Sequence, residues 1–259
     1  MNILVFDIET IPDVNAGRQL YNLNGTDAEV AARMFAQRAE ETGGSEFLKH
    51  HLHQIVAISV VLRQQDQFKV WSIGELESSE AELIQRFYDG IERYTPTLVS
   101  WNGSGFDLPV LHYRSLLHGI SAARYWEKGE YDQNFKWNNY LSRYHERHTD
   151  LMDVLAAYSN RANAPLDEIA TLLGFPGKMG MNGSKVWEAY LANDLPLIRN
   201  YCETDVLNTF LVYLRFLLLQ GKFSRATYQQ EISTIIQSLQ TSSKSHLQQF
   251  ANACKDNIS

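Results

Sequence analysis

The sequence predicts an α/β protein in which a mixed β-sheet, formed early in the chain, is flanked by helices. The 259 residues are 44% hydrophobic and 20% charged, which is ordinary for a globular protein with a substantial core. Most β-like runs come in the first part of the chain, and helical periodicity dominates the second half. A sheet that is built first and then covered by helices is the simplest architecture with this order.

The expected strands are short apolar runs bounded by polar or turn-forming residues, and they span residues 2–8, 55–63, 68–73 and 97–101. The first ends at an acidic pair and is broken by Pro12 and Asp13. The second and third are separated by a polar turn and predict a hairpin. Two helices accompany these strands: residues 79–94, whose start fits a capping box with Glu82, and residues 105–119.

The second half of the chain is predicted to form helices over residues 165–173, 184–192 and 195–220. Residues 14–53 are interpreted as an insertion, helix-like from Thr26 and interrupted by two glycines. Residues 1–222 then form the main domain, and residues 223–259 form a helical C-terminal extension. The extension carries an apolar stripe at helical spacing, made by Ile232, Ile235, Ile236 and Leu239. The stripe predicts either packing within the chain or a homodimer through the C-terminal helix.

Charge and composition restrict the class of protein. A net charge of −7 argues against broad binding to phosphate backbones, although a local acidic site can be reversed by bound cations. The two cysteines, Cys202 and Cys254, form no metal-binding or disulfide pattern and are expected to be free thiols. No leader-like start and no uninterrupted run of ~18 apolar residues are seen, which predicts a cytoplasmic protein without a membrane partner.

Three acidic stretches are candidates for chemistry. Asp7 and Glu9 are two positions apart in a predicted strand, so both carboxylates project from one face; alone, the pair would be a solvated strand end. Asp107 follows two glycines in WNGSGFDLPVL and could be an ordinary helix-start residue. Tyr201 and Asp205 share a helix face in YCETD, where the bland alternative is an exposed pair. Glu203 is offset from that face and is expected to be a surface acid.

Together, the strings FDIET, NGSGFDLP and YCETD resemble the motifs of the DEDD (DnaQ-like) 3′-5′ exonuclease superfamily, tyrosine subclass. The resemblance is greatest to the proofreading exonuclease domain of family B DNA polymerases. It covers roughly residues 1 to 220, including the softer stretches HTDLMDVL and LDEIATLLGFPGK. It implies a ribonuclease H-like fold.

The resemblance also implies the roles of the matching residues. Asp7, Glu9 and Asp205 would bind a first Mg²⁺ ion, and Asp107, with Asp7, would hold a second; Mn²⁺ could replace Mg²⁺. Clustered acids offset the repulsion between two cations that lie ~4 Å apart. Tyr201 would orient the attacking water, because a phenol with a pKa of ~10 is a poor general base at neutral pH. The residues expected to contact substrate are Thr10, Asn102, Phe106 and Lys178.

The implied activity is hydrolysis of the 3′-terminal phosphodiester of single-stranded nucleic acid, with DNA favoured, to release 5′-mononucleotides. Two alternatives stay open: a catalytically silent nucleic-acid-binding or scaffold module of the same fold, and an exoribonuclease that uses the same site. The pathway is open as well, since DNA repair, proofreading in trans and turnover all need such an enzyme.

Two weaker features have simpler explanations. Seven aromatic residues lie between Tyr125 and Tyr144, close to several basic residues; core packing explains most of them, and Trp126, Trp137 and Tyr140 are candidates for stacking on bases. The histidines at 50, 51, 53, 145 and 148 lack a zinc-binding pattern and are expected at the surface.

Overall fold

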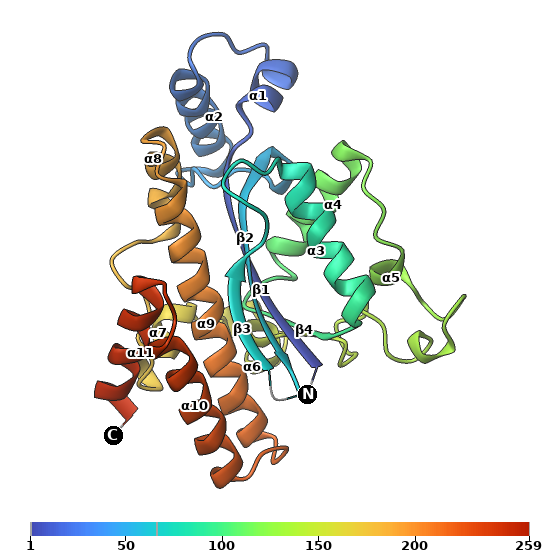
Figure 1. The fold of residues 1–259 in the computed structure, drawn as a ribbon. Helices are drawn as coiled ribbons and strands as arrows, with labels where there is room; N and C mark the ends of the chain where they lie inside the picture. The colour runs from blue at the N-terminus through green and yellow to red at the C-terminus, as the bar shows by residue number, and fades with distance from the viewer. Residues whose placement is uncertain (1, 66, 259) are drawn as a thin grey trace.

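The computed structural model describes residues 2–65 and 67–258, without the side chains of residues 255–258. Its centre is a five-stranded sheet in the order β3-β2-β1-β4-β5 (Figure 1). β1 pairs antiparallel with β2, as β2 does with β3, whereas β1–β4 and β4–β5 are parallel pairs. The strands are β1 (Asn2–Pro12), β2 (His53–Gln64), β3 (Gln67–Ser72), β4 (Thr97–Ser100) and β5 (His148–Asp150).

Helices cover both faces of the sheet, with α9, α10 and α11 on one side and α3 and α4 on the other (Figure 1). The described helices and 3₁₀ turns are α1 (Val14–Tyr21), α2 (Asp27–Thr42), η1 (His50–Leu52), α3 (Glu80–Tyr94), α4 (Asp107–His118), α5 (Ala123–Trp126), η2 (Gln133–Phe135), α6 (Leu151–Leu155), η3 (Asn160–Ala162), α7 (Leu166–Leu172), η4 (Gly183–Lys185), α8 (Val186–Leu191), α9 (Leu195–Leu219), α10 (Arg225–Gln240) and α11 (Ser245–Ile258). The predicted mixed α/β sheet of the ribonuclease H type, flanked by helices and followed by a helical C-terminus, is confirmed.

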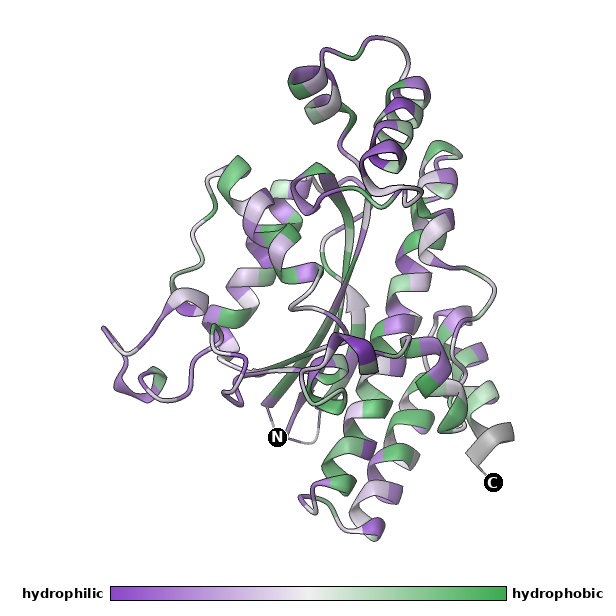
Figure 2. Cartoon of the chain, turned by 180° about the vertical axis from the view of Figure 1, so that it is seen from behind, coloured by the Kyte–Doolittle hydropathy of each residue, from purple (hydrophilic) through white to green (hydrophobic). Residues whose placement is uncertain are grey.

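Side-chain alternation along β1 divides the core into two layers. Leu4, Phe6 and Ile8 pack with α3 and α4. Ile3 and Val5 face the other way, into the cluster formed with α9. Hydrophobic segments run along the central strands and the helices beside them (Figure 2). The odd-numbered positions of β1 therefore face α9, as period-2 geometry requires.

The expectation that β1 ends at the acidic pair is wrong. The strand continues to Pro12, because the twelve-residue β2 pairs with it along its whole length. The register shifts once: Glu9 lies opposite Ala57 and Thr10 opposite Ile55, which leaves Val56 as an extra residue. The acids therefore lie inside a paired strand rather than at a frayed end.

Residues 14–52 begin with α1 and α2, which pack on each other around a small cluster that includes Val14, Val30 and Met34. α2 has a capping box at Thr26 and ends at Gly43, whose φ of 75° suits glycine. Whether this segment is an insertion into an exonuclease domain stays a prediction.

The apolar stripe of the C-terminal segment is covered within the chain. Ile232, Ile235 and Leu239 of α10 are buried in the same cluster as residues of α9 and α11. The division at residue 222 and a homodimer through the C-terminal helix both stay predictions. In the described part of the chain, every helix is too short or too polar to cross a membrane.

Candidate metal and active site

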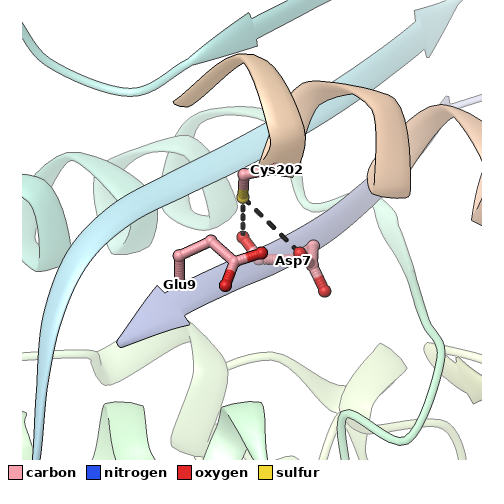
Figure 3. A group of neighbouring side chains, drawn as sticks. All are labelled: Asp7, Glu9 and Cys202. Atoms are coloured by element: carbon pink, nitrogen blue, oxygen red, sulfur yellow. Dashed lines mark hydrogen bonds between the residues drawn. The ribbon is translucent and has the colours of Figure 1, made fainter. Parts of the chain in front are cut away.

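Asp7 and Glu9 project from β1 toward α9, between two apolar clusters. Ile3 and Val5 precede them on this face, and Ile11, which follows, packs with Tyr201 and Cys202. A carboxylate oxygen of each acid and the Cys202 sulfur all lie within 4.8 Å of one another (Figure 3). The strand thus brings two hard oxygen donors to one point below α9.

Asp107 reaches the same region from the other side of β1. It is the first residue of α4 and is 4% exposed. β4 ends at Ser100, so β1 continues beyond it, and the Ile8 amide donates a hydrogen bond of 3.1 Å to Asp107 Oδ1. The start of α4 is therefore fixed to the middle of the acidic strand.

α9 supplies Tyr201, Cys202 and Asp205 on one stretch of helix. Tyr201 and Cys202 are buried, and the Cys202 thiol lies 3.5 Å from both the carbonyl oxygen and Oδ2 of Asp7. The Tyr201 hydroxyl forms a hydrogen bond with the Asp205 carboxylate, as their spacing of four residues allows.

A cleft of about 240 Å³ opens over these groups. Of the residues predicted to act on metal or substrate, seven line it: Asp7, Asn102, Phe106, Asp107, Lys178, Tyr201 and Asp205. Glu9 and Thr10 lie instead in the wall of a neighbouring pocket that shares Phe106 with the cleft. Three separate segments of the chain thus converge, with Glu9 in contact range of Asp7.

The electrostatics of the cleft favour a bound cation. Burial and the neighbouring acids raise the pKa of Asp7 and of Glu9 well above the usual carboxyl range. Burial also raises the pKa of Asp107 to about 7 and that of Asp205 to about 6. Within residues 2–65 and 67–258, none of these four acids forms an ion pair with a basic side chain. Uncompensated buried carboxylates fit the oxygen-ligand preference of Mg²⁺ and Mn²⁺.

The loop before α4 is held by an acid that no sequence motif singled out. Asp150, at the end of β5, accepts hydrogen bonds from the amides of Asn102 and Ser104, at 2.9 and 2.8 Å. Gly103 is needed here, because a Cβ atom would lie 2.3 Å from Ser100 Oγ. The stretch HTDLMDVL therefore contributes a loop anchor.

Lys178 lies on a loop that is tied to two helices. Its amide donates to Asp167 Oδ1 at 2.7 Å, and Asn208 of α9 brackets Gly177 with two hydrogen bonds. Gly177 has a φ of +62° and its Cβ position is crowded by Asp167, so glycine is required. The exposed Lys178 ammonium lowers the pKa of Asp205, which shows that its charge reaches the cleft.

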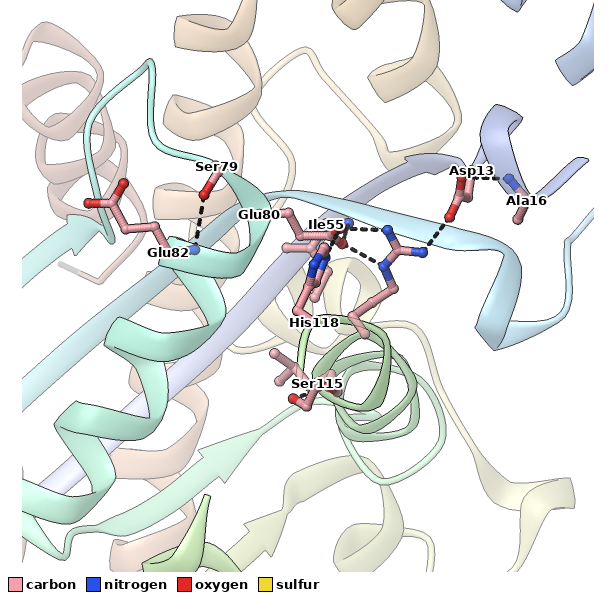
Figure 4. A network of polar contacts seen from close by, with 10 residues as sticks. Asp13, Ala16, Ile55, Ser79, Glu80, Glu82, Ser115 and His118 are labelled. Atoms are coloured by element: carbon pink, nitrogen blue, oxygen red, sulfur yellow. Dashed lines mark hydrogen bonds and ion pairs between the residues drawn. The ribbon is translucent and has the colours of Figure 1, made fainter. Parts of the chain in front are cut away.

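A buried ionic network connects the three elements behind the site (Figure 4). Arg114 of α4 donates to both Glu80 oxygens, at 2.8 and 2.5 Å, and also to Asp13, which caps α1 just after β1. Glu80 in turn accepts from the Ile55 amide of β2 and pairs with His118 at 2.8 Å. The helix that carries Asp107 is thereby fixed to the end of the strand that carries Asp7 and Glu9.

Several weaker expectations are corrected by burial. Glu203 is not a surface acid: it is 1% exposed and binds the Ser72 amide and hydroxyl, Lys244 and His246, at 2.7–2.9 Å. His53 and His148 are not at the surface either, and burial lowers the pKa of each to about 4.

The aromatic segment divides in a way that composition did not predict. Tyr125, Phe135 and Tyr140 are buried, so Tyr140 is not available for stacking on a base. The other four aromatics are exposed rather than in the core: Trp126, Tyr131, Trp137 and Tyr144.

The fold and the acidic cleft define a class of α/β protein with a candidate metal site between β1, α4 and α9. Residues 45–254 match the family described as "Predicted 3′-5′ exonuclease related to the exonuclease domain of PolB". Because the match covers most of the chain, the protein belongs to this family.

Two comparisons with individual proteins agree with that assignment. The chain is similar to the family B DNA polymerase from the hyperthermophilic archaeon Pyrobaculum calidifontis, with a TM-score of 0.50 and 18% identity over 97% of this chain and 27% of the polymerase. It is 44% identical over 45 residues to the catalytic polypeptide of DNA polymerase epsilon from Saccharomyces cerevisiae, over 17% of this chain. The chain thus spans about a quarter of the archaeal polymerase, and the match covers 2% of the yeast polypeptide.

Proposed function

We propose that the chain is a metal-dependent 3′-5′ exonuclease of the DEDD superfamily, tyrosine subclass, which releases 5′-mononucleotides from single-stranded 3′ ends, with DNA favoured. The carrying observation is the convergence of Asp7, Glu9, Asp107 and Asp205 without basic partners, beside Tyr201. Acids buried together in this way need positive charge, and the family supplies a reaction that uses it.

Asp7, Glu9 and Asp205 are proposed to hold one Mg²⁺ or Mn²⁺ ion, and Asp107 with Asp7 a second. Bound cations would acidify a water molecule and offset the charge of the phosphate. The chain itself fixes the positions: β1 presents the first two acids, and the Ile8 amide orients Asp107. Cys202 limits the movement of Asp7 through its two contacts with that residue.

Tyr201 is proposed to position the attacking water rather than to take its proton. Burial and the adjacent acids raise the pKa of its hydroxyl far above neutrality, so the phenol keeps its proton and can donate a hydrogen bond. Lys178 is proposed to bind a phosphate of the substrate, and Asn102, Phe106 and Thr10 to contact the nucleotides.

The test is digestion of matched single-stranded DNA and RNA, labelled at either end, with Mg²⁺ or Mn²⁺. Wild-type protein should shorten the strand from its 3′ end, whereas Asp7→Ala and Asp205→Ala should lose at least ~10²-fold in rate, the scale on which an essential charged group acts. Tyr201→Phe should weaken cleavage without abolishing it. Asp89→Ala, an exposed acid of α3, is the control. Equal rates in Asp7→Ala and wild type would remove the proposal, and faster RNA digestion would favour the exoribonuclease.

A further inference from the structure

A second pocket, of about 530 Å³, lies beside the acidic cleft and has no assigned role. Phe106 and Glu9 form its wall toward the cleft. The opposite walls come from Phe47 and Leu48 in the segment before β2, and from Trp187 of α8. Its size is within the range of about 300–1,000 Å³ that small-ligand sites occupy.

The aromatic wall is held rigidly. Phe47 contacts Phe106 and His53 with ring centroids 5.5 and 5.3 Å apart, and His50 Nε2 lies 2.8 Å from the Gly105 carbonyl oxygen. The Thr10 hydroxyl bonds to His53 at 2.8 Å. Yet Phe47 is 56% exposed, so a large apolar ring is fixed in place with one side uncovered. Such a ring is a suitable stacking surface for a planar ligand.

The charges of the two cavities differ. The pocket is lined by two full charges, Glu9 and Glu46, and by no lysine or arginine among its described residues. The cleft contains Lys178 as well as the acids. A phosphate is therefore disfavoured in the pocket, which suits an uncharged group attached to one that lies in the cleft.

We propose that this pocket binds the 3′-terminal nucleoside of the substrate, with Phe47 stacking on its base and Glu46 excluding ends that carry a 3′-phosphate. The inference rests on the proposed function, because only the terminal nucleoside of a strand cut at its last phosphodiester has no further phosphate. A base enclosed by these walls cannot be paired. The segment before β2 thus selects unpaired 3′-hydroxyl ends.

The kinetic test compares three single-stranded oligonucleotides that end in a normal 3′-nucleotide, an abasic tetrahydrofuran residue or a 3′-phosphate. Phe47→Ala should lower kcat/KM for the normal end by about tenfold, mostly through KM, as expected for one lost base–aromatic stack, and change the abasic end little. Glu46→Gln should narrow the preference for 3′-hydroxyl over 3′-phosphate. Trp137→Ala removes an aromatic that is 79% exposed but lines neither cavity, and should change none of these values. Equal effects of Phe47→Ala on normal and abasic ends would overturn the proposal.

A binding measurement separates this inference from the proposed function. Adenosine 5′-monophosphate should quench the fluorescence of Trp187, and Trp187→Phe should remove that signal. Phe47→Ala should weaken the binding, whereas ribose 5-phosphate should not produce the quench. If no substrate is digested but this base-dependent binding is seen, the pocket assignment stands and the exonuclease proposal fails. If digestion is seen and neither binding nor rate depends on Phe47, only the pocket assignment fails.

Discussion

Replacement of Arg114 by methionine tests whether the network behind the site fixes the acidic strand to α4. The side chains of Arg114, Asp13 and Glu80 are each only 6–7% exposed. Arg114→Met keeps most of the side-chain volume but leaves two buried carboxylates without their cation. Removal of one partner from a buried pair costs about 3–5 kcal/mol. For a chain of this size, 1 kcal/mol corresponds to about 2–4 °C, so Tm should fall by about 6–20 °C.

Urea unfolding and thermal scans measure this loss. The matched control is Arg18→Met, because the Arg18–Asp27 pair is 33% and 61% exposed and should contribute less than about 1 kcal/mol. The double variant Arg114→Met, Glu80→Gln should recover part of the stability, since one stranded charge is removed. Nuclease activity well below Tm should also fall, because α4 carries Asp107. A loss no greater than that of the control would refute the reasoning.

Three further outcomes follow from the described contacts. Mg²⁺ or Mn²⁺ at about 100 times its Kd should stabilise wild-type protein by about 2.7 kcal/mol relative to EDTA, but stabilise Asp7→Asn much less; equal shifts in thermal scans would argue against the metal site. Burial lowers the pKa of His148 from 6.5 to about 4, so the folded state binds fewer protons than the unfolded state in that window; stability is present above pH 6.5 and is lost as pH falls toward 4. Urea midpoints across this range should be flatter for His148→Gln, with the exposed His51→Gln unchanged. Glu203→Ala should cost roughly 3 kcal/mol, because it removes charge-assisted bonds and leaves the Ser72 amide unsatisfied; a loss matching that of the exposed Glu168→Ala would contradict this.

Local patterns predicted much of the fold. The Ser79 cap and the helix to Tyr94 are found as expected, and α9 begins at the predicted Leu195. These signals depend on neighbouring residues, which sequence displays directly. β5 was missed because it has only three residues, and its existence depends on pairing with β4 rather than on its own composition.

The candidate site was predictable to the extent that it is built from short motifs. Period-2 and helical spacing place Asp7 beside Glu9, and Tyr201 beside Asp205. What holds these groups was not predictable. Arg114 reaches Asp13 and Glu80, which are 101 and 34 residues away, and Asp150 anchors a loop 46–48 residues before it. Glu203 was expected to be exposed because its partners, Ser72 and Lys244, lie on distant segments.

The alternation along β1 means that folding and chemistry depend on one pairing frame. Ile3, Val5, Asp7, Glu9 and Ile11 occupy successive same-side positions of a single strand. A slip of one residue against β2 would turn the acids into the opposite apolar layer and move Leu4, Phe6 and Ile8 out of it. Such a slipped chain would bury charge and expose core together. A misregistered but stable, inactive form is thus excluded by the same energy that selects the native one.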